Sequence, residues 1–246
     1  MKLDLNADEI LVLRDVKPDM TSHGGFVWPK HGHAEAPDWR DDNQCGGGLH
    51  GLPWGVGGDY SIDDAGGLWL VVRVTKGRGS FQCGTGDMID KCKFRAGFVE
   101  FCGSREDAVA IIVGHAPPGT RCNWATQMAG CGSTQTAGNW STQTAGYDST
   151  QTAGDWSTQT AGDDSTQKAG CDSTQRAGGD STQKAGFDSV QIVRYFQGGW
   201  IVKTRTVTAE QADTWFVFEN GDWRLCTAEE AAAADARSAR EKNDEA

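Results

Sequence analysis

The chain contains no apolar run that approaches about 18 residues, so its sequence predicts no transmembrane helix. The first residues, Met1–Asp8, include no apolar segment of the kind found in signal peptides. Basic residues are also few, and 23 Lys and Arg against 34 Asp and Glu give a net charge of −11. Because nucleic-acid binding usually needs a basic surface, we expect no nucleic-acid partner. These absences together predict a cytoplasmic protein.

The signatures of common enzymes and metal sites are missing as well. The sequence has no CxxC pair, no GxxxxGK spacing, and no calcium-binding GGxGxD repeat. Its eight scattered cysteines favour free thiols in a reducing compartment. We therefore expect a protein that is not an enzyme and that needs no cofactor or metal.

What the chain does contain is an eight-residue repeat from Ala125 to about Asp188, with eight copies in register. Two successive copies are Ser133–Trp140, which reads STQTAGNW, and Ser141–Asp148, which reads STQTAGYD. A fixed period of this kind marks a repeat architecture. In an extended strand, Ser, Gln and Ala would share one face and the two Thr the other. The Gly and the two variable residues are typical of a corner.

The corner residues indicate that two octads form one coil. Trp124, Trp140 and Trp156 recur at steps of sixteen, and on a two-sided coil they would stack about 4.8 Å apart along one edge. The sequence thus predicts a β-solenoid of about four sixteen-residue coils. Ladders of Ser and Gln between coils would satisfy a Ser/Gln/Ala interior and leave Thr facing water. The reverse assignment, with Thr buried, has only the β-propensity of Thr in its favour.

The outward threonines form a regular grid of hydroxyl and methyl groups. Two Thr of one strand lie about 7 Å apart, and coils repeat about every 4.8 Å. The intact motifs, two on each side of the coil, are Thr134/Thr136, Thr142/Thr144, Thr150/Thr152 and Thr158/Thr160. In the later copies the second Thr is replaced by Lys168, Arg176 and Lys184.

This motif resembles the repeat of bacterial ice nucleation proteins, including the Gly146-Tyr147 corner. The resemblance implies that the eight threonines order water into an ice-like layer, so that ice or ordered water is the partner. It also implies that chains assemble through basic last coils and an aromatic edge. The candidate homo-oligomer contacts are Trp124, Trp140, Trp156, Tyr147, Lys168, Arg176 and Lys184. The chain departs from the family in having only four coils and in keeping one tyrosine of the tyrosine ladder. The alternative is a structural or self-assembly module without ice activity.

Residues 1–118 are expected to form a separate α+β domain that ends near Pro117-Pro118-Gly119. Its expected strands are Glu9–Arg14, Gly67–Thr75 and Gly97–Cys102, and Ser104 is expected to cap a helix that follows. A glycine-rich stretch, Cys45–Gly55, is interpreted as a tight structural loop. Two alternatives are an enzyme with Cys45 and His50 as a nucleophile pair, and a zinc site among His23, His31, His33, Cys45 and His50.

The repeat domain is expected to cover residues 119–189. Its aspartates at 148, 164, 172, 180 and 188 are interpreted as solvated corner carboxylates that accept hydrogen bonds from turn N–H groups, with calcium binding as the alternative. Residues 190–226 are expected to form two β-hairpins that close the open end of the solenoid. Thr227-Ala228-Glu229-Glu230 is a capping box, and it predicts a charged helical tail over 227–246, helical to about Arg240.

Overall fold

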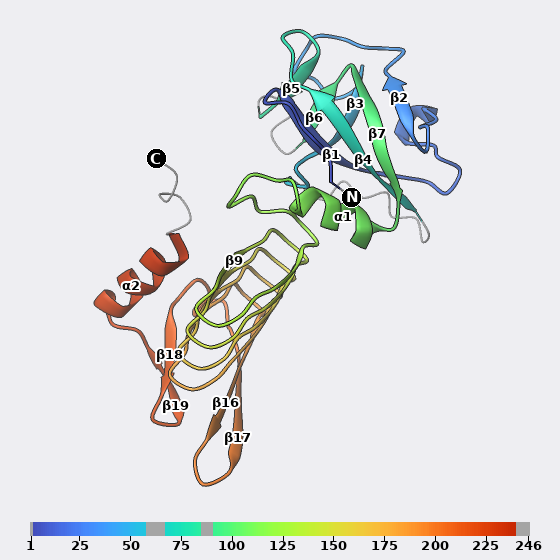
Figure 1. Cartoon of the computed structure of the whole chain (residues 1–246). Coiled ribbons are helices and arrows are strands. Elements are labelled where there is room, and N and C mark those ends of the chain that lie inside the picture. The colour runs from blue at the N-terminus through green and yellow to red at the C-terminus, as the bar shows by residue number, and fades with distance from the viewer. Residues whose placement is uncertain (1, 58–66, 85–90, 240–246) are drawn as a thin grey trace. The chain divides into compact units, whose positions relative to one another are not determined.

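A computed structural model describes residues 2–57, 67–84 and 91–239, and it divides the chain into two compact units, Met1–Cys122 and Asn123–Ala246 (Figure 1). The first unit is β-rich. Its seven-stranded antiparallel sheet has the order β2-β7-β4-β1-β3-β6-β5. The strands are β1 (Glu9–Val16), β2 (Gly32–Glu35), β3 (Leu49–Pro53), β4 (Leu68–Thr75), β5 (Phe81–Cys83), β6 (Cys92–Phe94) and β7 (Ala96–Gly103).

One α-helix of this unit, α1 (Arg105–Val113), packs against β1 and β4. As predicted, it begins at Ser104, whose hydroxyl accepts a hydrogen bond from the backbone N–H of Asp107 at 3.1 Å. A short 3₁₀ turn lies at His23–Gly25. The core forms on the strands, where Val12, Val72 and Phe94 are fully buried. Sequence patterns predicted β1, β4 and β7 but missed β2, β3, β5 and β6.

The second unit contains the predicted β-solenoid, whose stacked coils are visible in Figure 1. We call its two parallel stacks the open sheet and the covered sheet, for reasons given below. The open sheet contains β8 (Thr126–Met128), β10 (Thr142–Thr144), β12 (Thr158–Thr160), β14 (Thr174–Ala177), β16 (Val190–Phe196) and β17 (Trp200–Thr206). The covered sheet contains β9 (Thr134–Thr136), β11 (Thr150–Thr152), β13 (Thr166–Lys168), β15 (Thr182–Lys184), β18 (Phe216–Glu219) and β19 (Asp222–Leu225). Thr142 pairs with Thr158, which confirms the sixteen-residue coil.

Glutamine and serine ladders fill the interior of the solenoid, as predicted. Gln143 Nε2 donates to Gln127 Oε1 of the preceding coil at 2.9 Å and to the Thr152 carbonyl across the interior at 3.2 Å. Ser157 Oγ accepts from the backbone N–H of Ser141 at 3.3 Å. The amides of the middle coils thus satisfy their neighbours in a buried core, where an unpaired polar group would be costly. The alternative with a threonine interior is therefore wrong.

The corners differ from the prediction in one respect. The left-handed backbone conformation falls on the last residue of the octad, for example Trp140 (φ 54°) and Asp148 (φ 52°), and not on the Ala-Gly glycine. That glycine is required by the close approach of the coils, because a Cβ on Gly162 would lie 2.8 Å from the backbone of Tyr147. The corner carboxylates that accept amide hydrogen bonds from the next coil are Asp155 and Asp163, both at 2.8 Å, and these are not the predicted aspartates.

The predicted hairpins close the C-terminal end of the solenoid. Strand β16 continues the open sheet and pairs antiparallel with β17, while β18 pairs antiparallel with β15 and with β19. Asn220 and Gly221 both have positive φ, as the Asn-Gly turn requires. The two strand edges at this end are therefore paired instead of left open.

The capping box also forms. Glu230 accepts from the Thr227 N–H at 2.7 Å, and Thr227 Oγ1 accepts from the Glu230 N–H at 3.2 Å. It opens helix α2 (Ala228–Ala239). The predicted end near Arg240 and the tail after it lie outside the described residues. In the part of the chain that the structure describes, no helix is long and apolar enough to cross a membrane.

Candidate functional site

The two threonine faces of the solenoid are not equivalent, because α2 packs on one of them. This helix contacts β11 and β13 of the covered sheet. Thr152 and Thr166 are 4% and 2% exposed there, and Thr136, one coil away in the column of Thr152, is 7% exposed. The prediction that every outward threonine faces water is therefore wrong for Thr136 and Thr152. Thr134 stays exposed and Thr150 is partly buried.

Two of the three basic substitutions also lie on the covered sheet and contact the C-terminal elements. Lys168 Nζ is 3.9 Å from Asp235 of α2, whose Ala234 is buried. Lys184 Nζ lies 5.7 Å from the ring centroid of Trp215. Both side chains thus contact groups of their own chain, whereas Arg176 is exposed on the open sheet.

The open sheet presents two columns of side chains across its strands. In the first column, Thr126, Thr142, Thr158 and Thr174 lie in register, followed by Val190 and its cross-strand partner Thr206. In the second, Met128, Thr144, Thr160 and Arg176 lie in register, followed by Ile192 and its partner Thr204. Six strands at about 4.8 Å give a face roughly 24 Å long.

Sequence reasoning found only the middle of this face, Thr142, Thr144, Thr158 and Thr160. It left out Thr126 and Thr174 because each belongs to an octad whose second Thr is replaced, although the octad phase already pointed to them. Thr204 and Thr206 lie outside the repeat, and only the antiparallel register of β16 and β17 places them on this face. Arg176 is the one charged residue in the two columns. Apart from Arg176, the face can therefore offer water an uncharged grid of hydroxyl and methyl groups.

The predicted tryptophan column forms along one corner of the solenoid. The ring centroids of Trp124 and Trp140 are 5.4 Å apart, and those of Trp140 and Trp156 are 5.0 Å apart, with interplanar angles of 11° and 6°. Trp156 is 50% exposed at the end of this stack, whereas Tyr147, which is 61% exposed, lies on the opposite corner, between β10 and β11. The edge thus presents aromatic surface that could contact a partner.

The glycine-rich stretch of the first unit is partly a strand. Leu49–Pro53 is β3, which pairs with β1 and β6, so the interpretation of Cys45–Gly55 as one loop is wrong over those residues. Gly51 permits the pairing, because a Cβ there would lie 2.4 Å from Val12 Cγ1. Burial, followed by the nearby charges of Lys91, Arg14 and Lys93, lowers the pKa of His50 to about 4. His50 is therefore neutral near pH 7 and would be a weak general base.

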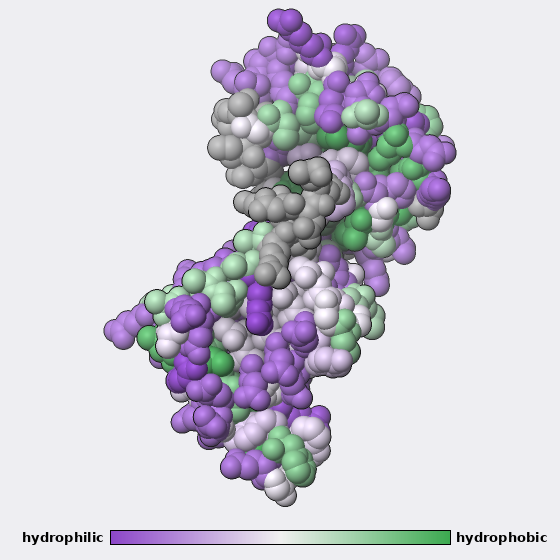
Figure 2. Space-filling view, turned by 60° about the vertical axis from the view of Figure 1, so that its left-hand side comes forward, coloured by the Kyte–Doolittle hydropathy of each residue, from purple (hydrophilic) through white to green (hydrophobic). Residues whose placement is uncertain are grey.

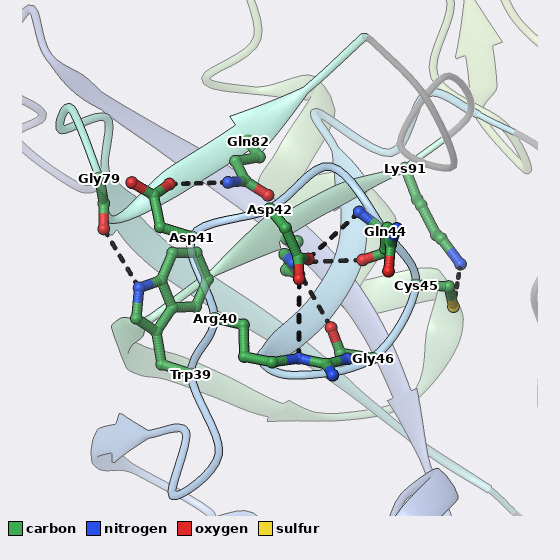
Figure 3. Close-up of polar contacts among 11 residues, drawn as sticks. Trp39, Arg40, Asp41, Asp42, Gln44, Cys45, Gly46, Gly79, Gln82 and Lys91 are labelled. Carbon is green, nitrogen blue, oxygen red and sulfur yellow. Dashed lines mark hydrogen bonds and ion pairs between the residues drawn. The ribbon is translucent and has the colours of Figure 1, made fainter.

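The loop before β3, whose residues Asp42, Gln44 and Gly46 are shown in Figure 3, surrounds the buried ammonium of Lys93. Lys93 Nζ donates to Asp42 Oδ1 at 2.6 Å and to the carbonyls of Gln44 and Gly46 at 3.1 and 3.4 Å. Its ammonium also lies 5.4 Å from the ring centroid of Trp39. This set of contacts satisfies the charge of a lysine side chain that is fully buried. The arrangement supports the structural interpretation of the glycine-rich stretch.

The alternative enzyme and zinc sites receive little support from the geometry. Cys45 Sγ is 3.0 Å from Lys91 Nζ (Figure 3). Over the described residues, no group of three or more His, Cys, Asp or Glu is placed to hold a metal ion. The side chain of His23, one of the five predicted zinc ligands, lies outside the described part.

Comparison with known proteins gives similarity to ice nucleation proteins. The chain is 30% identical over 131 residues to an ice nucleation protein of Enterobacter agglomerans and 30% identical over 119 residues to ice nucleation protein InaU of Pantoea ananas. It is 44% identical over 111 residues to an ice nucleation protein of Xanthomonas campestris pv. translucens. These matches cover 52%, 48% and 45% of this chain but only 10%, 11% and 7% of the relatives.

The chain therefore spans about a tenth of the length of these curated relatives. No family model and no solved structure matches it. Stacked sixteen-residue coils with buried Gln and Ser ladders, together with these similarities, identify the chain as an ice-nucleation-like β-solenoid repeat protein.

Proposed function

We propose that the outer face of the open sheet orders water and gives the protein weak ice-binding or ice-nucleating activity. The observation that carries this proposal is the column Thr126, Thr142, Thr158 and Thr174, which lies in register without a charged residue. Thr144 and Thr160 add a second, shorter column about 7 Å away. The names of the relatives describe ice nucleation, which agrees with a non-enzymatic role.

The rigid interior supports this role. Below each pair of threonines lies a glutamine that is fully buried, such as Gln143 and Gln159, and it is bonded to the glutamines of neighbouring coils. The backbones of β10, β12 and β14 are also paired on both sides. Threonine hydroxyls are therefore held at fixed spacings, so little conformational freedom has to be lost when they hydrogen-bond to a water layer, while the methyl groups hold that layer between them.

The test uses lysines on the open face. Thr144→Lys with Thr160→Lys should remove most of the effect of the purified protein on droplet freezing temperature and on ice-crystal shape. A cation fits this column without disturbing the fold, because Arg176 already occupies it one coil further on. Thr134→Lys is the matched control, since Thr134 is exposed on the other sheet. Equal activity of the open-face variant, the control and the unchanged protein would refute the proposal.

The aromatic edge favours a second candidate function, self-assembly. Trp156 is exposed at the end of the tryptophan stack, and exposed stacked aromatics often mark an interface. A homo-oligomer formed at this edge would be larger at higher concentration in sedimentation velocity, and Trp156→Ala should return it to monomer. A strict monomer at high concentration would count against this function and would leave the water-ordering face unaffected.

A further inference from the structure

The β16–β17 hairpin differs in charge from the rest of the chain. Over 190–207 it carries three basic residues, Arg194, Lys203 and Arg205, and no acidic residue, whereas the whole chain has a net charge of −11. In the described part of the chain, none of these three cations has a carboxylate within ion-pair distance. The hairpin is therefore a local positive region whose charge is not neutralised by its own fold.

The tip of the same hairpin is aromatic and exposed. Phe196, Trp200 and Val202 are 66%, 64% and 60% exposed. Phe196 and Trp200 face each other across the turn, with ring centroids 5.6 Å apart, and the Arg194 guanidinium lies 4.1 Å from the Trp200 ring. Burying such rings in the core would stabilise the fold, so their exposure on a paired, well-formed hairpin needs another explanation.

The hairpin also projects beyond the coils. Strands β16 and β17 have seven residues each, whereas the strands of the preceding coils have three or four. Figure 1 shows it extending past the stacked coils, and Figure 2 shows hydrophobic residues gathered at that end of the unit. The turn Gln197-Gly198-Gly199 between the two aromatics contains two glycines and no charged residue. The tip can therefore contact a surface outside the protein without any movement of the solenoid.

We propose that this hairpin tip docks on an anionic lipid surface. Phe196 and Trp200 would enter the boundary between headgroups and acyl chains, where aromatic side chains are favoured. At about 3.3 Å per residue, Arg194 lies roughly 7 Å behind Phe196 and Lys203 roughly 10 Å behind Trp200. An interfacial group inserts about 5–10 Å, so both cations reach the level of the lipid phosphates.

A lipid surface fits this tip better than a protein partner does. A stable protein interface uses about 20–30 residues from each side, and a convex tip with three large exposed apolar side chains supplies far fewer. A bilayer deforms around such a tip and needs no matching shape. The absence of acidic residues over 190–207 removes the repulsion that the rest of this acidic chain would meet at an anionic surface.

The experiment is vesicle co-sedimentation of the full chain. Vesicles of phosphatidylcholine alone are compared with vesicles in which part of it is replaced by phosphatidylglycerol. Binding to the anionic vesicles is expected, with weak or no binding to phosphatidylcholine alone. Phe196→Ala with Trp200→Ala should reduce the partition coefficient about tenfold or more, since two partly buried aromatic rings are lost. Phe187→Ala is the matched control, because Phe187 is 52% exposed elsewhere in this unit and should leave binding unchanged.

A charge variant tests the cations while it keeps both aromatic side chains of the tip. Arg194→Gln with Lys203→Gln should weaken binding to anionic vesicles about fivefold for each cation, the factor that corresponds to ~1 kcal/mol near an anionic surface. Circular dichroism and the melting temperature confirm that each variant is folded. No binding, equal binding to both kinds of vesicle, or binding unaffected by the aromatic variant would overturn the proposal. So would aromatic-dependent self-association of the chain without vesicle binding.

Discussion

Gly162 lies so close to the preceding coil that a Cβ added to it would be 2.8 Å from the backbone N and Cα of Tyr147. Gly130 occupies the same position of the octad in the first coil, and a Cβ there would meet nothing within 4 Å. We therefore expect Gly162→Ala to lower the free energy of unfolding by about 1–3 kcal/mol through overpacking. Gly130→Ala should leave it unchanged or raise it slightly. Urea unfolding of both variants checks this, and equal losses would contradict the close approach.

The buried Lys93 leads to a second prediction at the scale of single residues. Asp42→Asn leaves a buried ammonium without its carboxylate, whereas Lys93→Met removes the charge and keeps most of the side-chain volume. We expect the asparagine variant to be the less stable of the two in urea. The reverse order would show that the carbonyls of Gln44 and Gly46 satisfy the ammonium without Asp42.

The same ion pair makes the first unit sensitive to acid. The hydrogen bond from Lys93 is the largest cause that lowers the pKa of Asp42 below its ordinary value. A lowered folded-state pKa means that the stabilisation is present above the unfolded-state pKa of about 3.9 and is lost as pH falls through the folded-state value. Between pH 7 and pH 3, the unchanged protein should therefore lose more stability than Asp42→Asn. Parallel pH profiles of the two would contradict this.

At the scale of elements, sequence patterns predicted the helices and strands whose formation depends on residues close in sequence. The octad predicted the short strands and their pairing at sixteen residues, and the β16–β17 hairpin begins at Val190 as expected. Strands β3 and β6 were missed because Leu49–Pro53 contains His50 and Gly51 and shows no clean alternation. Strand β3 pairs with β1, which is distant in sequence, and β6 pairs with β3 and β5. The position of α2 could not be predicted either, because only Ala234 of its residues is buried and nothing local indicates which face it covers.

Helix α2 covers part of the threonine face of the covered sheet. Ending the chain after Cys226 removes α2 and should expose Thr150, Thr152 and Thr166, while β18 still pairs with β15. If threonine grids order water, the shortened protein should be more active in droplet freezing than the full chain. Thr150→Lys should then reduce activity in the shortened chain more than in the full chain. If Thr150→Lys had the same small effect on activity in the shortened and the full chain, the threonines of the covered sheet would contribute nothing even without α2.

At the scale of the whole molecule, the length of the open face limits how large an ordered water layer it can support. Inserting a second copy of Ser141–Trp156 adds one complete coil, keeps the tryptophan and threonine columns in register, and lengthens the face by about 4.8 Å. We expect each such insertion to raise the droplet freezing temperature. Inserting only the eight residues Ser141–Asp148 is the informative control. It would shift every later octad to the opposite sheet, so that β16 and β18 would meet the wrong partners.

This eight-residue variant should lose stability and ice activity together, although it contains more Thr-Gln-Thr motifs than the natural chain. Both insertions add Thr-Gln-Thr motifs, but only the sixteen-residue insertion keeps the columns in register. Comparing the two variants therefore separates the effect of the number of motifs from the effect of their arrangement. If the eight-residue insertion were as stable and as active as the sixteen-residue one, the coil would not be the unit of the fold. The register of the columns would then not be the origin of the activity.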